Sequence, residues 1–210
     1  MKYYLLKLRT IFNKKILKYF IIEFILITIY AFLMSEGNKY YELIMGINVI
    51  NLNNEPMEIL IRIINTSVIM LSTSIIYTYD LTRNVEYIFL REDKKKIYIK
   101  HLIACIIYNT SMMIVFFLLY LILFKNINMD TIKIFITGII NTIYITTITT
   151  SIINFISSKK NVLLVMSLSL LVLNIFKISN FGYLEFIITT FLIIYNYYIF
   201  NPREVFNKLN

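Results

Sequence analysis

Long apolar stretches alternate with short charged ones along this chain, and the lengths of the apolar stretches predict its fold. A helix needs roughly 20 apolar residues to cross the hydrocarbon core of a membrane. Six stretches approach that length, and we expect each to form a membrane-spanning helix. Their approximate ranges are 18–34, 59–79, 101–124, 134–156, 162–177 and 184–200. The stretches are continuously apolar rather than alternating, which favours helices over a β-barrel.

The expected fold is an all-α membrane protein with residues 1–210 as a single domain. The fifth stretch is short, so residues 162–183 form either a full span or a helix that re-enters the membrane near Gly182. Residues 2–15 mix basic and apolar side chains. That mixture suits either an N-terminal helix lying in the membrane interface or a simple basic tail.

The composition agrees with a membrane protein, because 59% of the residues are hydrophobic and the mean hydropathy is +0.72. Ile, Asn, Lys, Tyr and Phe are all abundant, as AT-rich coding would produce. We therefore give isolated asparagines little weight as functional signals.

The basic residues predict an orientation. All but five of the 21 lysines and arginines fall on one side of the membrane when the six spans are drawn. The five exceptions are Lys39, Arg62, Lys125, Lys133 and Lys177. The positive-inside rule then places both termini in the cytoplasm, in a bacterial-type cytoplasmic membrane. The net charge of +9 fits attraction to anionic membrane lipids, and no nucleic-acid-binding motif accompanies it.

The densest charge lies at residues 83–102, RNVEYIFLREDKKKIYIKHL, between the second and third spans. Asp80 is suited to cap a helix that begins here. Four apolar residues would share one face of this helix, namely Leu81, Val85, Ile88 and Phe89. Such a face on a short cytoplasmic helix meets either the membrane surface or a partner protein.

This layout of basic N-terminus, two spans, charged amphipathic helix, basic turn and third span resembles the permease subunits of ABC-2-type ATP-binding cassette transporters. In that family the charged segment is a coupling helix that contacts the ATPase. The run YDLTRNVEYIFLREDKKKIYIKHLIA is similar to it, but lacks the family's Gly-Thr pair and Pro-containing turn. The resemblance implies that the ATPase-coupling residues are Leu81, Arg83, Val85, Glu86, Ile88, Phe89 and Arg91.

The resemblance also implies partners: an ABC ATPase subunit, and a second permease subunit that is identical or related. The chain has no GxxxxGK[ST] motif, so ATP and Mg would be bound by the ATPase subunit and not here. A single cysteine, Cys105, and a single histidine, His101, leave no metal cluster and no catalytic set for an intramembrane protease. We expect no metal, no bound cofactor and no enzymatic activity in this chain.

Two features within the spans are candidates for a substrate path. Glu23 lies inside the first span, where a charged group costs about 2.5 to 3.5 kcal/mol. It either attracts a cation in a cytoplasm-facing cavity or pairs with a lysine at the interface. In the fourth span small and polar residues recur every four positions, at Gly138, Thr142, Thr146, Thr150, Asn154 and Ser158. Such a stripe favours close helix packing, and Thr142, Thr146 and Thr150 would alternatively line the path.

The predicted function is export or expulsion of an amphipathic or hydrophobic substrate, such as an antimicrobial peptide, toxin or lipid, including self-immunity of a peptide producer. Two alternatives remain open. One is the six-span substrate-binding subunit of an energy-coupling factor importer. The other is a non-transporting membrane protein with an immunity or scaffold role.

Overall fold

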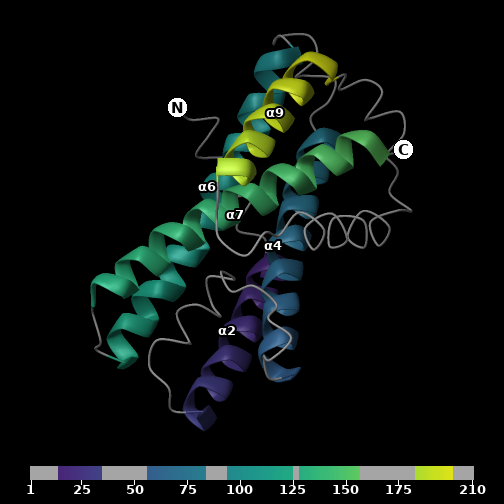
Figure 1. Cartoon of the computed structure of the whole chain (residues 1–210). Helices are drawn as coiled ribbons and strands as arrows, with labels where there is room; N and C mark the ends of the chain where they lie inside the picture. The colour runs from purple at the N-terminus through teal and green to yellow at the C-terminus, as the bar shows by residue number, and fades with distance from the viewer. Residues whose placement is uncertain (1–13, 35–55, 84–93, 125–127, 157–182, 201–210) are drawn as a thin grey trace.

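The computed structural model describes residues 14–34, 56–83, 94–124, 128–156 and 183–200, and these residues are almost entirely helical (Figure 1). The helices are α2 (Lys14–Met34), α4 (Pro56–Arg83), α6 (Lys94–Phe124), α7 (Met129–Ile156) and α9 (Tyr183–Ile199). The described part of the chain contains no strand. The prediction of an all-α fold is confirmed for these residues.

Each described helix coincides with one of the predicted spans, but most of the helices begin earlier than expected. The interfacial helix predicted at 2–15 lies outside the described residues except for its last two positions, which belong to α2. The predicted span at 162–177 also lies outside them. The count of six spans therefore stays a prediction.

Capping determines where α7 begins. The Thr131 hydroxyl accepts a hydrogen bond from the backbone N–H of Asn128 at 3.2 Å, and the Ile132 N–H donates to the Asn128 carbonyl at 3.3 Å. This is one half of a capping box, in which a side chain satisfies the backbone ahead of the first turn. Asp130 adds a negative charge at the positive end of the helix dipole. The helix therefore starts at Met129, ahead of the apolar run.

The predicted helix start at Asp80 is wrong, because α4 runs without interruption from Pro56 to Arg83 and so passes through Asp80. No glycine or proline occurs between Tyr77 and Arg83 that would end the helix. Asp80 is an interior residue of α4 and not an N-cap.

Helix α7 is central to the described bundle, since it packs against α4, α6 and α9. Helix α4 also packs against α2 and α6, and α6 packs against α9. Near the α6–α7 connection the rings of Phe117 and Phe135 stack with centroids 4.4 Å apart. The bundle is therefore built around three long helices, α4, α6 and α7.

The two shorter helices lie at opposite ends of this bundle (Figure 1), α2 at the lower end and α9 at the upper end. On α9, Tyr197 and Tyr198 receive the Lys95 ammonium group at 5.3 and 5.0 Å from their ring centroids. These contacts lie at the start of α6. The aromatic contacts of α2 fall instead on the middle and second half of α6, at Tyr108, Phe116 and Tyr120. With 31 residues, α6 is about 46 Å long and has room for both partners.

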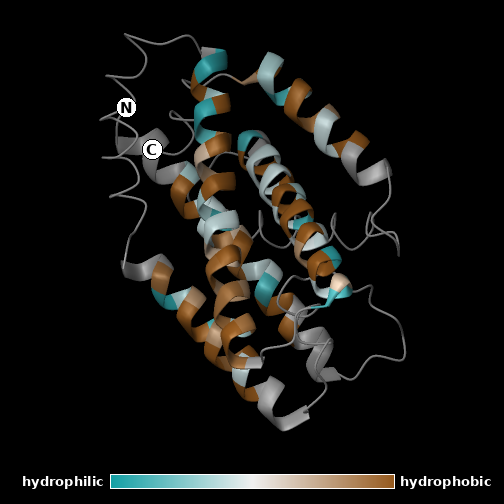
Figure 2. Ribbon diagram, turned by 90° about the vertical axis from the view of Figure 1, so that its left-hand side faces the viewer, coloured by the Kyte–Doolittle hydropathy of each residue, from teal (hydrophilic) through white to brown (hydrophobic). Residues whose placement is uncertain are grey.

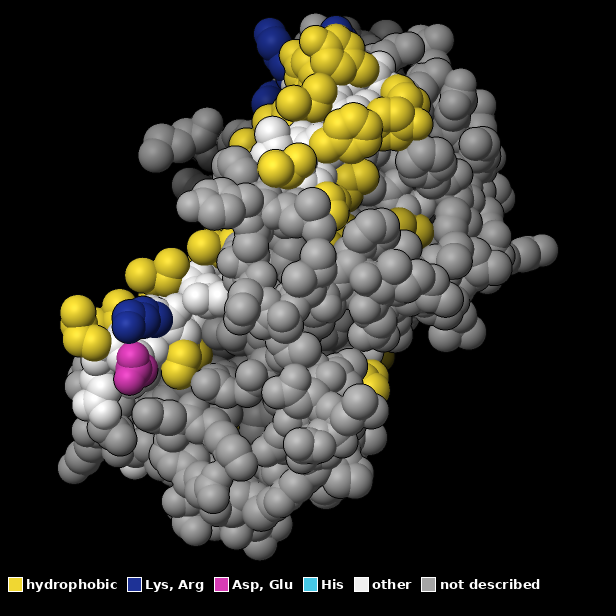
Figure 3. Space-filling model, viewed as in Figure 1, with side chains coloured by type: hydrophobic (Ala, Val, Ile, Leu, Met, Phe, Trp, Pro, Cys, Tyr) yellow, Lys and Arg dark blue, Asp and Glu magenta, His cyan; other side chains and the backbone are white. Residues whose placement is uncertain are grey.

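Many exposed side chains of the described helices are large and apolar, while many of the buried side chains are polar. Figure 2 shows hydrophilic residues interspersed among the hydrophobic ones along the helices. Large apolar side chains that are at least 50% exposed include Ile22, Ile29, Ile107, Leu118, Ile136 and Phe191. Polar side chains that are no more than 3% exposed include Asn65, Ser72, Thr73, Asn109, Thr142, Thr146, Thr150, Ser151 and Asn196. Figure 3 shows apolar side chains gathered on the surface over α9.

Two of the described helices are long and apolar enough to cross a membrane, over Lys95–Leu123 and Met129–Asn154. Shorter apolar helical stretches occupy Ile63–Tyr77 and Ile187–Ile199. By length and composition, the described helices are compatible with a membrane protein.

Candidate functional site

The predicted ATPase-coupling residues are only partly within the described chain. Leu81 and Arg83 belong to the last turn of α4. The remaining five, Val85, Glu86, Ile88, Phe89 and Arg91, lie outside the described residues. Their role stays a prediction, but the segment that holds them follows directly from a helix whose contacts are known.

The threonines of the predicted stripe are all fully buried on α7. Each hydroxyl donates to a carbonyl of its own helix: Thr142 to Gly138 and Thr146 to Thr142, both at 2.8 Å, and Thr150 to Thr147 at 2.9 Å. Hydroxyls that are satisfied within their own helix can be buried against neighbouring helices at low cost. These bonds favour the packing interpretation of the stripe, and a role in a substrate path stays a prediction.

One threonine of the stripe also joins a polar cluster that connects three helices. Asn109 of α6 accepts a hydrogen bond from the Ser72 hydroxyl at 2.6 Å. Its Nδ2 donates to the Thr73 hydroxyl at 2.8 Å and to the Thr146 hydroxyl at 3.0 Å. The amide therefore uses both its donor hydrogens and its acceptor, linking α4 and α7 through α6. We refer to Ser72, Thr73, Asn109 and Thr146 as the Asn109 cluster.

A second polar chain connects α4, α7 and α9. The Tyr77 hydroxyl donates to Asn154 Oδ1 at 2.7 Å, and Asn154 Nδ2 donates to Asn196 Oδ1 at 3.0 Å. Asn196 Nδ2 then donates to the Ser151 hydroxyl at 2.8 Å and to the Leu192 carbonyl at 2.7 Å. We refer to Tyr77, Ser151, Asn154 and Asn196 as the Asn196 chain. It holds the last turns of α4 against α7 and α9.

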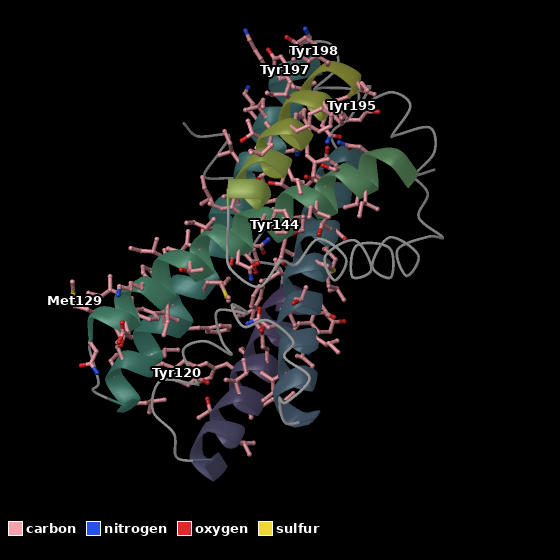
Figure 4. All side chains as sticks on the ribbon, in the orientation of Figure 1. Tyr120, Met129, Tyr144, Tyr195, Tyr197 and Tyr198 are labelled. Atoms are coloured by element: carbon pink, nitrogen blue, oxygen red, sulfur yellow. The ribbon has the colours of Figure 1, made fainter. Side chains whose placement is uncertain are left out.

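Glu23 is 1% exposed, and no hydrogen bond reaches its Oε2 from the residues that the structure describes. Its nearest described neighbours on the same face of α2 are Phe20, one turn before, and Ile27, one turn after, both buried. The next residue of α2, Phe24, contacts Tyr120 of α6 with ring centroids 5.3 Å apart. Figure 4 shows Tyr120 at the end of the bundle where α2 lies.

The cytoplasm-facing cavity expected at Glu23 stays a prediction. The ring contacts of α2 fall on the middle and second half of α6, at Tyr108, Phe116 and Tyr120. Glu23 and the threonines also lie in different surroundings, since Thr146 contacts Asn109 whereas Phe24, the residue after Glu23, contacts Phe116 and Tyr120. The two predicted parts of the substrate path are therefore on different helices with separate surroundings.

Sequence reasoning missed Asn109, Asn196 and Tyr77 as important residues. Isolated asparagines were given little weight because the chain is rich in them, and that choice hid Asn109, whose amide makes three interhelical hydrogen bonds, and Asn196, whose amide makes two. A stronger signal was available, because Asn109, Thr110 and Ser111 form the only run of three polar residues within the apolar stretch 101–124.

His101 and Cys105 are buried, and His101 lies edge-on to Tyr77 with ring centroids 6.0 Å apart. Among the described residues no three His, Cys, Asp or Glu side chains come together in a way that could hold a metal ion. No family model, curated protein or solved structure matches this chain. Its function has to be inferred from its own residues.

Proposed function

We propose that this chain is the membrane-spanning permease subunit of an ABC-2-type exporter in a bacterial-type cytoplasmic membrane. Its cargo would be an amphipathic or hydrophobic molecule such as an antimicrobial peptide, a toxin or a lipid. ATP and Mg would be bound by a separate ATPase subunit, and a second permease subunit would complete the path. This chain itself would have no enzymatic activity.

The observation that carries the membrane part of this proposal is the polarity of the bundle. Soluble monomers rarely expose contiguous apolar patches larger than a few hundred Å². Here α2, α6, α7 and α9 each expose several large apolar side chains, while Asn109 and Asn196 are buried. Lipid chains solvate the first set, and interhelical hydrogen bonds satisfy the second, which is the pattern typical of membrane helix packing.

The transport part of the proposal rests on how the charged segment is attached. Helix α4 extends beyond its apolar stretch and carries Leu81 and Arg83 in its last turn. A continuous helix transmits a displacement at one end along its length. Tyr77, one turn before Leu81, is hydrogen-bonded into the Asn196 chain. Movement of the predicted coupling segment at 81–91 would therefore act directly on α7 and α9.

The proposal is tested by recovering the tagged chain from its native host in mild detergent and identifying bound proteins by mass spectrometry. We expect an ABC ATPase subunit with the wild-type chain, and its loss from a Val85→Asp/Phe89→Asp variant, because two charges on the apolar face would prevent docking. A Tyr87→Asp variant is the matched control, since residue 87 falls on another face of the predicted helix.

Three results would decide between the permease and a non-transporting membrane protein, and would test the predicted coupling face. An ATPase that binds the wild type and the control but not the double variant supports the permease. Folded protein that recovers no ATPase in any form overturns it and favours an immunity or scaffold protein. An ATPase retained by the double variant would mean that coupling does not use the face formed by Leu81, Val85, Ile88 and Phe89.

A further inference from the structure

The packing of the described helices leaves one oxygen of the buried Glu23 carboxyl group without a hydrogen-bond partner. It is 1% exposed, lies within an apolar helix, and its Oε2 has no hydrogen-bond partner in the described structure. A buried polar atom without a partner is unusual in native proteins and indicates strain, a functional role or a missing ligand. Two polar side chains at other helix contacts, Asn109 and Asn196, are by contrast satisfied by hydrogen bonds.

Aromatic rings line the contact between α2 and α6 on both sides of Glu23. Phe20 lies 6.1 Å from Tyr108 and 5.8 Å from Phe116, measured between ring centroids. Phe24 lies 5.3 Å from Phe116 and 5.3 Å from Tyr120. Further along, the Thr28 hydroxyl is 3.0 Å from the Tyr120 hydroxyl. Glu23 therefore shares the buried side of α2 with two aromatic rings, Phe20 and Phe24, which are about one turn apart and both contact rings of α6.

We propose that Glu23 and these rings form an intramembrane binding site for a lipophilic organic cation, such as a substituted ammonium or phosphonium ion. A carboxylate in an apolar medium needs a counter-charge, because an unpaired buried charge is costly. The faces of Phe and Tyr rings attract a desolvated cation. The site thus supplies one charge and several rings, which matches a monovalent cation with apolar substituents.

An inorganic cation fits the same position poorly. Calcium requires six to eight oxygen ligands and magnesium a near-ideal octahedron, whereas the buried side chains one turn to either side of Glu23 on α2 are Phe20 and Ile27. An organic cation needs only one full counter-charge, because its substituents gain from apolar contact. The proposed preference for an organic over an inorganic cation therefore follows from the surroundings of the carboxyl group and not from its charge alone.

The ligand of this site would define the chemical class of the exported substrate, and that conclusion rests on the proposed function. Binding itself depends on this chain alone. It can be measured on the purified full-length protein in detergent, with no ATPase present, using tetraphenylphosphonium as the probe and equilibrium dialysis as the readout. Triphenylphosphine oxide, which keeps the rings and lacks the full charge, is the matched ligand.

We expect the wild-type chain to bind tetraphenylphosphonium at least tenfold more tightly than the Glu23→Gln variant does, because glutamine keeps the shape and removes the charge. The Glu23→Asp variant keeps the charge and should bind more tightly than Glu23→Gln. Phe24→Leu should weaken binding severalfold, as expected for loss of one cation–π contact. Triphenylphosphine oxide should bind the wild type and Glu23→Gln equally.

Equal binding of tetraphenylphosphonium by folded wild type and Glu23→Gln overturns the site, and so does absence of binding to folded wild type. Circular dichroism and size-exclusion chromatography establish folding in each case. If Glu23→Gln does not fold, the comparison of wild type with Phe24→Leu decides, and unchanged affinity there overturns the site. The ATPase recovery described above is expected to be the same for wild type and Glu23→Gln, so failure of the site and failure of the permease proposal are distinguishable.

Discussion

At the scale of single residues, Asn109 shows how much one polar side chain can organise in an apolar bundle. Its amide makes three hydrogen bonds to hydroxyls on α4 and α7, and all four side chains are buried. Hydrogen bonds between membrane helices contribute about 0.6 kcal/mol on average and up to about 1.7 kcal/mol. The Asn109 cluster is therefore a modest source of stability but a strong determinant of which helix faces meet.

Two threonines of the α7 stripe distinguish the effect of an interhelical hydrogen bond in the Asn109 cluster from that of a hydrogen bond within α7. Thr146→Val removes a hydroxyl that accepts from Asn109, and we expect it to lower the free energy of unfolding by about 1 kcal/mol. Thr142→Val removes a hydroxyl that bonds only within α7 in the described structure, and should cost a few tenths of a kcal/mol, as expected for a local back-bond. The free energies of unfolding of both variants are measured in mixed micelles with an increasing fraction of denaturing detergent.

As a control, both threonine substitutions are also measured in a protein that carries Asn109→Leu. If the hydroxyl acts through the Asn109 cluster, the extra cost of Thr146→Val disappears there, since the two side chains are then coupled. Equal costs for Thr142→Val and Thr146→Val in both backgrounds would contradict this assignment.

At the scale of elements, the apolar runs were sufficient to predict where the described helices lie, but not where they begin. Hydropathy does not register the Asn128–Thr131 cap that starts α7. It also treats the charged start of α6 as a loop, although Ile97 and Tyr98 there are buried. The four-residue stripe predicted a buried face of α7 correctly. Its interhelical partner Asn109 could not be read from the pattern, because periodicity on one helix says nothing about its neighbours.

The hydrogen bond that holds the end of α4 against its neighbours leads to a prediction about local opening of this helix. Tyr77→Phe deletes the hydrogen bond to Asn154 while keeping the ring, so it should loosen the last turns of α4. We expect backbone amides of residues 78–83 to exchange with deuterium several times faster, measured by mass spectrometry, because local opening is governed by nearby contacts.

The matched control is Tyr120→Phe, which removes the hydroxyl that pairs with Thr28 at the α2 end of the bundle. Exchange at residues 78–83 should not change in this variant. Equal acceleration by both variants would mean that the effect is global destabilisation and that the Asn196 chain does not specifically hold α4.

At the scale of the whole molecule, the staggered placement of α2 and α9 along α6 was not predictable from span lengths. Hydropathy treats every apolar run as an equivalent membrane crossing at the same depth. Lys95 and Tyr98, near the start of α6, contact Tyr197 and Phe200 at the α9 end of the bundle. Tyr108 and Tyr120, further along α6, contact α2. The position of a helix along the α6 axis depends on which pairs of aromatic side chains are in contact. The hydropathy of a single apolar run contains no information about such pairs. The contact of Phe24, the residue after Glu23, with Tyr120 is a consequence of this stagger.

The apolar exterior carries the last prediction, which concerns the medium around the bundle. Spin labels at Ile107→Cys, Ile136→Cys and Phe191→Cys, in a Cys105→Ala background reconstituted in vesicles, should be relaxed more by oxygen than by a water-soluble nickel complex. Oxygen partitions into lipid, whereas the nickel complex stays in water, and the parent side chains are at least 50% exposed. Lys133→Cys is the control, because Lys133 is exposed beside Asp130 near the start of α7 and should be relaxed mainly by the nickel complex. Dominant relaxation by nickel at all three apolar positions would show that water surrounds these faces, and the membrane assignment would then be wrong.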